Sequence, residues 1–205
     1  MEVANPQTWL IAGALSALFL GFVALVEIAK RKFSLSSEIT RRVVHIGAGL
    51  CAWLDYALLP GWLFAALSLG GGLIFTLSYR ANLITSVHNV VRKTYGELWL
   101  TAGIVGAYWV SLLNPAKAVF LPALLVVTLA DSAAGLVSDI FRQPRKMWRG
   151  SAVFFVITAA ILLVSGNPAY LALPFALALT AVERYSPLGS DNVTVPLTAA
   201  ALLLL

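Results

Sequence analysis

An acidic residue stands inside an apolar stretch near the middle of the chain. The segment TLADSAAG, residues 128–135, places Asp131 in a run that is otherwise apolar from 118 to 137. A carboxylate buried in lipid costs several kcal/mol unless it faces a polar cavity, a cation or a metal. Two interpretations are open: a buried ion pair with an arginine of a neighbouring helix, or a ligand site, which the small residues at 132–135 favour by allowing close approach.

A basic stretch follows that aspartate. The segment RQPRKMWRGS, residues 142–151, holds four cations and ends in Gly150 and Ser151, where the next apolar segment begins. Gly150 allows close backbone approach, Ser151 can cap a helix, and the free N–H groups of a first helical turn favour an anion. Basic loops also orient membrane proteins and attract anionic lipids. Opposite the carboxylate of Asp131, however, these groups are suited to a metal-bound polyphosphate.

An acidic turn near the C-terminus offers further oxygen ligands. In VERYSPLGSDNVTVP, residues 182–196, Glu183, Asp191 and Asn192 flank a turn that contains Pro and Gly. These side chains fit Mg²⁺, and they equally fit a solvated loop whose Asp or Asn caps the last helix. Likewise, His45 is either an interfacial hydrogen-bonded residue or a proton acceptor.

The elements that must position these residues are membrane helices. Hydrophobic residues make up 60% of the chain and charged residues 11%, and the mean hydropathy is +0.88, which indicates an integral membrane protein. Its 205 residues leave room for a single domain, 1–205. Because lipid excludes open sheet edges, the fold class is predicted to be all-α, a polytopic helix bundle. The apolar segments are 9–29, 43–59, 61–79, 98–113, 118–138, 151–164, 170–182 and 193–205.

The last three segments are short, so the expected number of transmembrane helices is six to eight, with eight favoured. With the N-terminus outside, the inner loops are 30–42, 80–97, 139–150 and 183–192, and they carry thirteen of the fourteen basic residues. This is the distribution that the positive-inside rule describes, so the net charge of +5 gives no reason to expect a nucleic-acid partner. Most acidic residues also fall at the inner end, which places the expected active site near the cytoplasmic face. Gly70, Gly71 and Gly72 indicate close helix packing or a kink rather than a phosphate loop.

Four separated motifs resemble the CTP-dependent polyprenol kinases, which include dolichol kinase and the phytol and farnesol kinases. They are EITRRVVHIGAG at 38–49, ADSAAGLVS at 130–138, KMWRGSAVFF at 146–155 and ERYSPLGSDNVTVP at 183–196. Together they span most of the chain in the family's order, and the short length is most similar to the phytol kinase branch. The resemblance implies a membrane enzyme that transfers the terminal phosphate of a nucleoside triphosphate, CTP as the expected donor, to a long-chain isoprenoid alcohol such as phytol, farnesol, geranylgeraniol or a polyprenol. It also implies Mg²⁺ or another divalent cation as cofactor.

Carried over residue by residue, the resemblance assigns roles to the charged positions. Asp131 matches the family's intramembrane aspartate, and either Asp131 or His45 would accept the hydroxyl proton. Asp131, Glu183 and Asp191 would hold the metal. The nucleotide would be bound by Arg42, Lys146, Arg149, Gly150, Ser151 and Asn192. The chain departs from the family's usual pattern at Ser138–Asp139 and Lys146–Met147, and at Arg149, where an acidic residue is usual.

Other functions fit parts of the same pattern. A cytidylyltransferase that forms a CDP-lipid would also use CTP and intramembrane carboxylates, and a CTP-dependent diacylglycerol kinase would differ only in its acceptor. A small transporter ranks third, because no internal repeat is visible and the polar residues gather at one membrane surface. The expected partners are the lipid alcohol, the nucleotide and membrane lipids, and the sequence is also compatible with a homo-oligomer.

Overall fold

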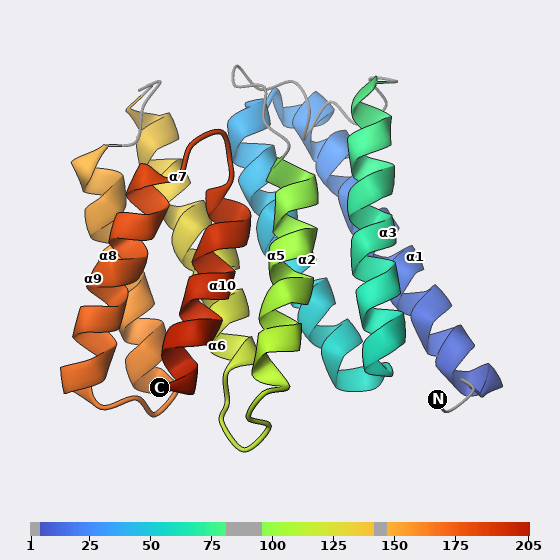
Figure 1. Cartoon of the computed structure of the whole chain (residues 1–205). Coiled ribbons are helices and arrows are strands. Elements are labelled where there is room, and N and C mark those ends of the chain that lie inside the picture. The colour runs from blue at the N-terminus through green and yellow to red at the C-terminus, as the bar shows by residue number, and fades with distance from the viewer. Residues whose placement is uncertain (1–4, 81–95, 142–146) are drawn as a thin grey trace.

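The chain folds into a bundle of helices that lie side by side (Figure 1). The computed structural model describes residues 5–80, 96–141 and 147–205, and in these ranges the regular elements are all helical. They are α1 (Pro6–Phe33), α2 (Ser37–Leu58), α3 (Gly61–Arg80), α5 (Gly96–Ser111), α6 (Phe120–Leu125), the π-helical turn η1 (Val126–Ala130), α7 (Asp131–Ile140), α8 (Trp148–Val164), α9 (Ala169–Tyr185) and α10 (Asp191–Leu204). The prediction of an all-α membrane bundle is confirmed.

Each apolar segment expected from the sequence coincides with a helical rod, since α6, η1 and α7 follow one another as one rod. Among the described residues, three rods are long and apolar enough to cross a membrane, Pro6–Phe33, Gly61–Ser78 and Phe120–Ile140, and α8 and α10 are shorter apolar helices. Both termini lie at the same end of the bundle (Figure 1).

Helix ends extend beyond the apolar segments because polar residues cap them. The Asn5 side chain accepts a hydrogen bond from the Thr8 N–H at 2.9 Å, at the start of α1. That helix continues through three cations, 30–32, which interact favourably with the negative end of the helix dipole. Ser36 caps α2 by accepting from the Ile39 N–H at 3.3 Å, so α2 begins six residues before the apolar segment at 43. The polar residues at 38–45 are therefore held on a helix.

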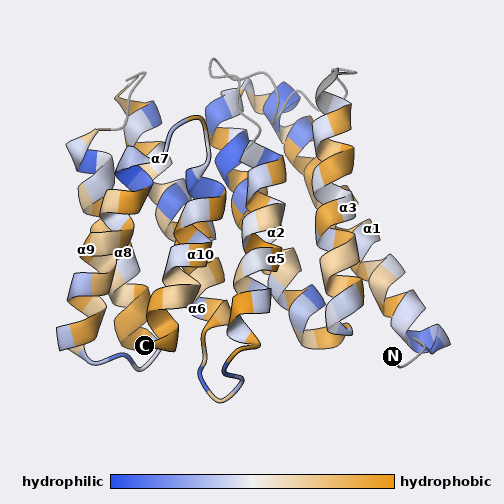
Figure 2. Cartoon of the chain, viewed as in Figure 1, coloured by the Kyte–Doolittle hydropathy of each residue, from blue (hydrophilic) through white to orange (hydrophobic). Residues whose placement is uncertain are grey.

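Apolar residues fill the middle of the bundle, and hydrophilic residues gather mainly at the end where α2, α7 and α10 have their polar turns (Figure 2). The largest fully buried side chains include Phe64, Phe154 and Leu179, which belong to one continuous core. Gly103 lets α5 approach α10 closely, because a Cβ there would overlap the carbonyl oxygen of Asn192. The tight packing of α5 on α10 holds the first turn of α10 in place, and this turn carries Asp191 and Asn192.

Candidate active site

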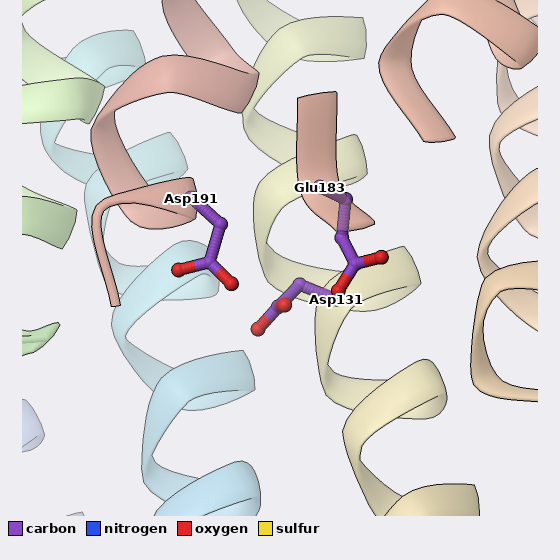
Figure 3. Close-up of side chains that lie close together, drawn as sticks. All are labelled: Asp131, Glu183 and Asp191. Carbon is purple, nitrogen blue, oxygen red and sulfur yellow. The ribbon is translucent and has the colours of Figure 1, made fainter. Parts of the chain in front are cut away.

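Three carboxylates from distant parts of the sequence meet at the polar end of the bundle. Asp131 is the first residue of α7, Glu183 lies in the last turn of α9, and Asp191 begins α10. The three side chains lie close together in Figure 3. One oxygen from each lies within 4.8 Å of the others, and each residue is more than nine-tenths buried. Like charges this close in a buried place repel strongly, so this arrangement favours a bound cation.

A tight turn brings Glu183 and Asp191 together. Leu188 and Gly189 both have positive φ, 53° and 82°, between the end of α9 and the start of α10. The Ser186 and Thr194 hydroxyls lie 2.8 Å apart and tie the two sides of this turn. The chain therefore reverses within a few residues, and the two acidic side chains face the same space.

A π-helical turn determines the direction of Asp131. Its N–H bonds to the carbonyl of Val126, five residues back, instead of to that of Val127, four residues back. The ring of His45 meets the Val127 carbonyl, with Nε2 3.0 Å from the oxygen. A carbonyl oxygen can only accept, so Nε2 carries the proton and donates. Such π-turns inside α-helices are frequent at functional sites.

Arg42 of α2 forms an ion pair with Asp131. Its Nη1 lies 3.0 Å from Asp131 Oδ2, and its Nε lies 3.6 Å from Asp139 Oδ2. A Cβ on Gly135 would overlap the Arg42 guanidinium, so the glycine gives this arginine access to the aspartate. Asp131 thus pairs with an arginine of a neighbouring helix, as the first interpretation predicts, and it also belongs to the carboxylate cluster, which leaves the ligand-site interpretation a prediction.

The carboxylates line a cavity of about 670 Å³ between α2, α7, α8, α9 and α10. Its other charged lining residues are Arg41, Arg42, Asp139 and Arg184. This cavity is large enough for a small-molecule ligand, for which pockets of roughly 300–1,000 Å³ are usual. The opposed carboxylates and guanidinium groups suit a ligand that carries both a cation and phosphates.

Four of the six predicted nucleotide-binding residues line this cavity. They are Arg42, Gly150, Ser151 and Asn192. Lys146 lies outside the described residues. Arg149 is exposed on α8, with its guanidinium carbon 4.7 Å from the centre of the Phe141 ring, and does not line the cavity. The structure therefore brings most of the predicted site together and separates Arg149 from it.

Two details differ from the expected start of α8. The helix begins at Trp148, three residues before Ser151, so Ser151 does not cap it. Instead, the Ser151 hydroxyl accepts a hydrogen bond from Arg184 Nη1 at 3.2 Å. Gly150 packs against α7, where a Cβ would lie 2.9 Å from Ser138 Oγ. The first turn of α8 still faces the cavity, and it has no side-chain cap.

Sequence reasoning did not assign site roles to Arg41, Asp139 or Arg184, although all three line the cavity. Arg184 directly follows the predicted ligand Glu183, and this adjacency was a usable signal. Asn192, by contrast, was predicted and has a second role, since its Nδ2 donates to the Gly96 carbonyl at 3.0 Å and ties α10 to α5.

The fold and the site together define a membrane-embedded enzyme that holds a highly charged cavity against an apolar helical core. The chain is 33% identical to the phytol kinase of Synechocystis sp., in an alignment that covers 98% of this chain and 94% of that protein. The chain therefore belongs to the polyprenol and phytol kinase family, and the predicted resemblance to that family is confirmed. No protein-family model and no solved structure matches the chain.

Proposed function

We propose that this protein is a lipid kinase that transfers the terminal phosphoryl group of a nucleoside triphosphate to the hydroxyl of a long-chain isoprenoid alcohol. CTP is the expected donor, and phytol, farnesol, geranylgeraniol and longer polyprenols are the candidate acceptors. The observation that carries the proposal is the buried cluster of Asp131, Glu183 and Asp191 beside cationic side chains. The family relation to a phytol kinase supports the kind of acceptor.

The carboxylate cluster fits a divalent cation. Mg²⁺ prefers carboxylate oxygens as ligands. One oxygen from each of the three carboxylates lies within 4.8 Å of the others, so Asp131, Glu183 and Asp191 would hold the cation. A divalent cation there would neutralise charge on the triphosphate.

The phosphates would contact the opposite wall of the cavity. Arg42 and Arg184 supply guanidinium groups, which bind phosphate through paired hydrogen bonds. The uncapped first turn of α8, at Gly150, adds backbone N–H groups at the positive end of a helix dipole. Lys146 remains a predicted phosphate contact. Arg149 is omitted because it packs on aromatic rings outside the cavity.

His45 is proposed to accept the hydroxyl proton. Its Nε2 is engaged with the Val127 carbonyl, so in the neutral ring Nδ1 is the nitrogen that can accept a proton. Asp131 is paired with Arg42 and takes part in the carboxylate cluster, which assigns it to charge neutralisation. Phosphoryl transfer depends mainly on positioning and electrostatics, and this division of roles meets both needs. The cavity would open to the cytoplasmic face, where the basic loops are expected.

The test is a transfer assay with the purified protein, Mg²⁺ and either CTP or ATP labelled in the γ-phosphate. The acceptors are phytol, farnesol, geranylgeraniol, dolichol and diacylglycerol, and the products are separated by chromatography. Label in a prenyl monophosphate is the expected result. A nucleotidyl lipid with release of pyrophosphate would indicate a cytidylyltransferase, and label in phosphatidic acid alone would indicate a diacylglycerol kinase. Absence of label from every lipid with both nucleotides would refute the kinase.

A further inference from the structure

A second cavity, of about 310 Å³, lies between α1, α2, α3 and α5. Its lining is mainly apolar, with Phe19, Ala48 and Phe75 among the side chains. Polar groups stand at one end, where Arg41 forms an ion pair with Glu97 at 3.6 Å and His45 lies in the same wall. Arg41 also lines the carboxylate cavity, so the two cavities meet at this residue.

The second cavity follows α2 away from that junction. Its lining on α2 runs from Arg41 to Asp55, which is about 21 Å at 1.5 Å per residue. That length is about two thirds of the roughly 30 Å hydrocarbon core of a bilayer. Asp55 is buried at the far end, and its Oδ1 has no hydrogen-bond partner. A hydrocarbon chain extending beyond this point would bury apolar groups against a carboxylate oxygen that has no hydrogen-bond partner, which is unfavourable.

Lipid can reach this cavity from the side of the bundle. Leu20 of α1 and Ile74 of α3 line it and are also exposed on the outer surface. Gly71 of α3 lines it as well, and a Cβ at this position would meet no atom within 4 Å. The neighbouring Gly72 has another role, because a Cβ there would overlap Thr101 of α5. The glycine triplet thus combines close helix packing at one position with open space at another.

We propose that this apolar cavity holds the hydrocarbon chain of the acceptor alcohol, with its hydroxyl end at Arg41 and His45 and its length limited by Asp55. The inference rests on the proposed kinase function and adds where the acceptor binds. It explains why an apolar cavity shares a residue with the charged one: the hydroxyl group must reach the phosphates while the chain stays out of water. It favours alcohols of phytol and geranylgeraniol length over dolichol.

The first test narrows the cavity at its midpoint. Gly71 lies ten residues into α3, about 15 Å from its start, so Gly71→Leu divides the length of the cavity. Gly21→Leu is the matched control, since a Cβ at Gly21 also meets no atom within 4 Å and Gly21 lines neither cavity. Both changes raise helix propensity, so loss of folding is not expected from either.

For Gly71→Leu we expect the KM for geranylgeraniol to rise more than about tenfold, since each methylene group kept out of the cavity weakens binding by about fourfold. The KM for the shorter farnesol should rise less, and Gly21→Leu should match the wild type with both alcohols. Asp55→Leu should improve the use of alcohols longer than geranylgeraniol. An identical chain-length profile in the wild type, Gly71→Leu and Gly21→Leu would overturn the inference.

The second test measures binding without turnover. Cys51 is the single cysteine of the chain and lines the apolar cavity, so labelling of its thiol by methyl methanethiosulfonate reports access. Geranylgeraniol without nucleotide should slow this labelling in the wild type and much less in Gly71→Leu. A labelling rate that geranylgeraniol leaves unchanged would contradict an open chain-binding cavity. A wild type that transfers no phosphate but shows protection would refute the kinase function alone.

Discussion

Replacing Asp131 by asparagine separates a structural ion pair from a cation site. The pair between Arg42 and Asp131, 3.0 Å apart, corresponds to about 5–6 kcal/mol of attraction at an effective dielectric constant of about 20. With all three carboxylates ionised, each oxygen pair within 4.8 Å contributes at least about 3.5 kcal/mol of repulsion on the same scale. Asp131 takes part in two such pairs, so the repulsion that Asp131→Asn removes is at least as large as the attraction that it loses.

Without divalent cations, we therefore expect Asp131→Asn to have a Tm equal to or above that of the wild type. With Mg²⁺ at about 100 times its Kd, the wild type should gain about 2.7 kcal/mol. For a chain of this size that gain raises the Tm by roughly 5–10 °C. The variant should lack most of this increase and should transfer no phosphate. Thermal unfolding in detergent, followed by the fluorescence of the six tryptophans, measures both effects.

Asp139→Asn is the matched control, because it removes another carboxylate that contacts Arg42 and leaves the three-carboxylate cluster intact. It should keep the increase in Tm with Mg²⁺. The reasoning is refuted if Asp131→Asn loses several degrees in the absence of cations and both variants respond equally to Mg²⁺. Asp131 would then act as the structural partner of Arg42.

Three further predictions concern the same cavity. Glu183→Gln and Asp191→Asn should each raise the Mg²⁺ concentration for half-maximal activity about 10- to 100-fold, and an unchanged Mg²⁺ titration would exclude them as ligands. Arg42→Gln should lower kcat/KM for the nucleotide about 10- to 100-fold, since it removes hydrogen bonds between a charged donor and phosphate. Arg31→Gln changes an exposed arginine and is the control. Equal activity of the two variants would contradict a role of Arg42 in binding phosphate. His45→Gln can still donate to the Val127 carbonyl but cannot accept the proton, so kcat should fall about 100-fold, and a wild-type kcat would assign His45 to packing alone.

The sequence predicted the helices well because apolar runs of this length have few alternatives in lipid. It was less successful at helix ends, since the first turn of a membrane helix need not be apolar. The α8 helix starts at Trp148, within the basic stretch, and α2 starts at Ser37, within a polar one. Capping by Ser36 and the exposed position of Trp148 allow these turns to extend past the apolar segments.

Most residues of the candidate site were predicted from the sequence, but the contacts between them were not. The resemblance to the kinase family implied that Asp131, Glu183 and Asp191 act together. Physical chemistry supports that grouping, because a carboxylate buried in a membrane needs a cation or an ion pair. By contrast, the π-turn at Val126–Ala130 has an ordinary apolar sequence, VVTLA. Nothing in this sequence indicates that the turn closes with a bond five residues back instead of four. The pairing of Arg42 with Asp131 joins residues 89 positions apart, and no periodicity within one helix can reveal it.

Residues of one turn of α2 line both the charged cavity and the apolar cavity. Arg41 and Arg42 are consecutive, so their side chains leave the helix about 100° apart at 3.6 residues per turn. Arg42 thereby reaches Asp131 in the charged cavity, while Arg41 pairs with Glu97 where the apolar cavity begins. His45, one turn further on, holds the π-turn that orients Asp131 and lines the apolar cavity itself. A single helical turn therefore contacts both the proposed phosphate site and the proposed alcohol site, which is the proximity that transfer between water-soluble and lipid-soluble substrates requires.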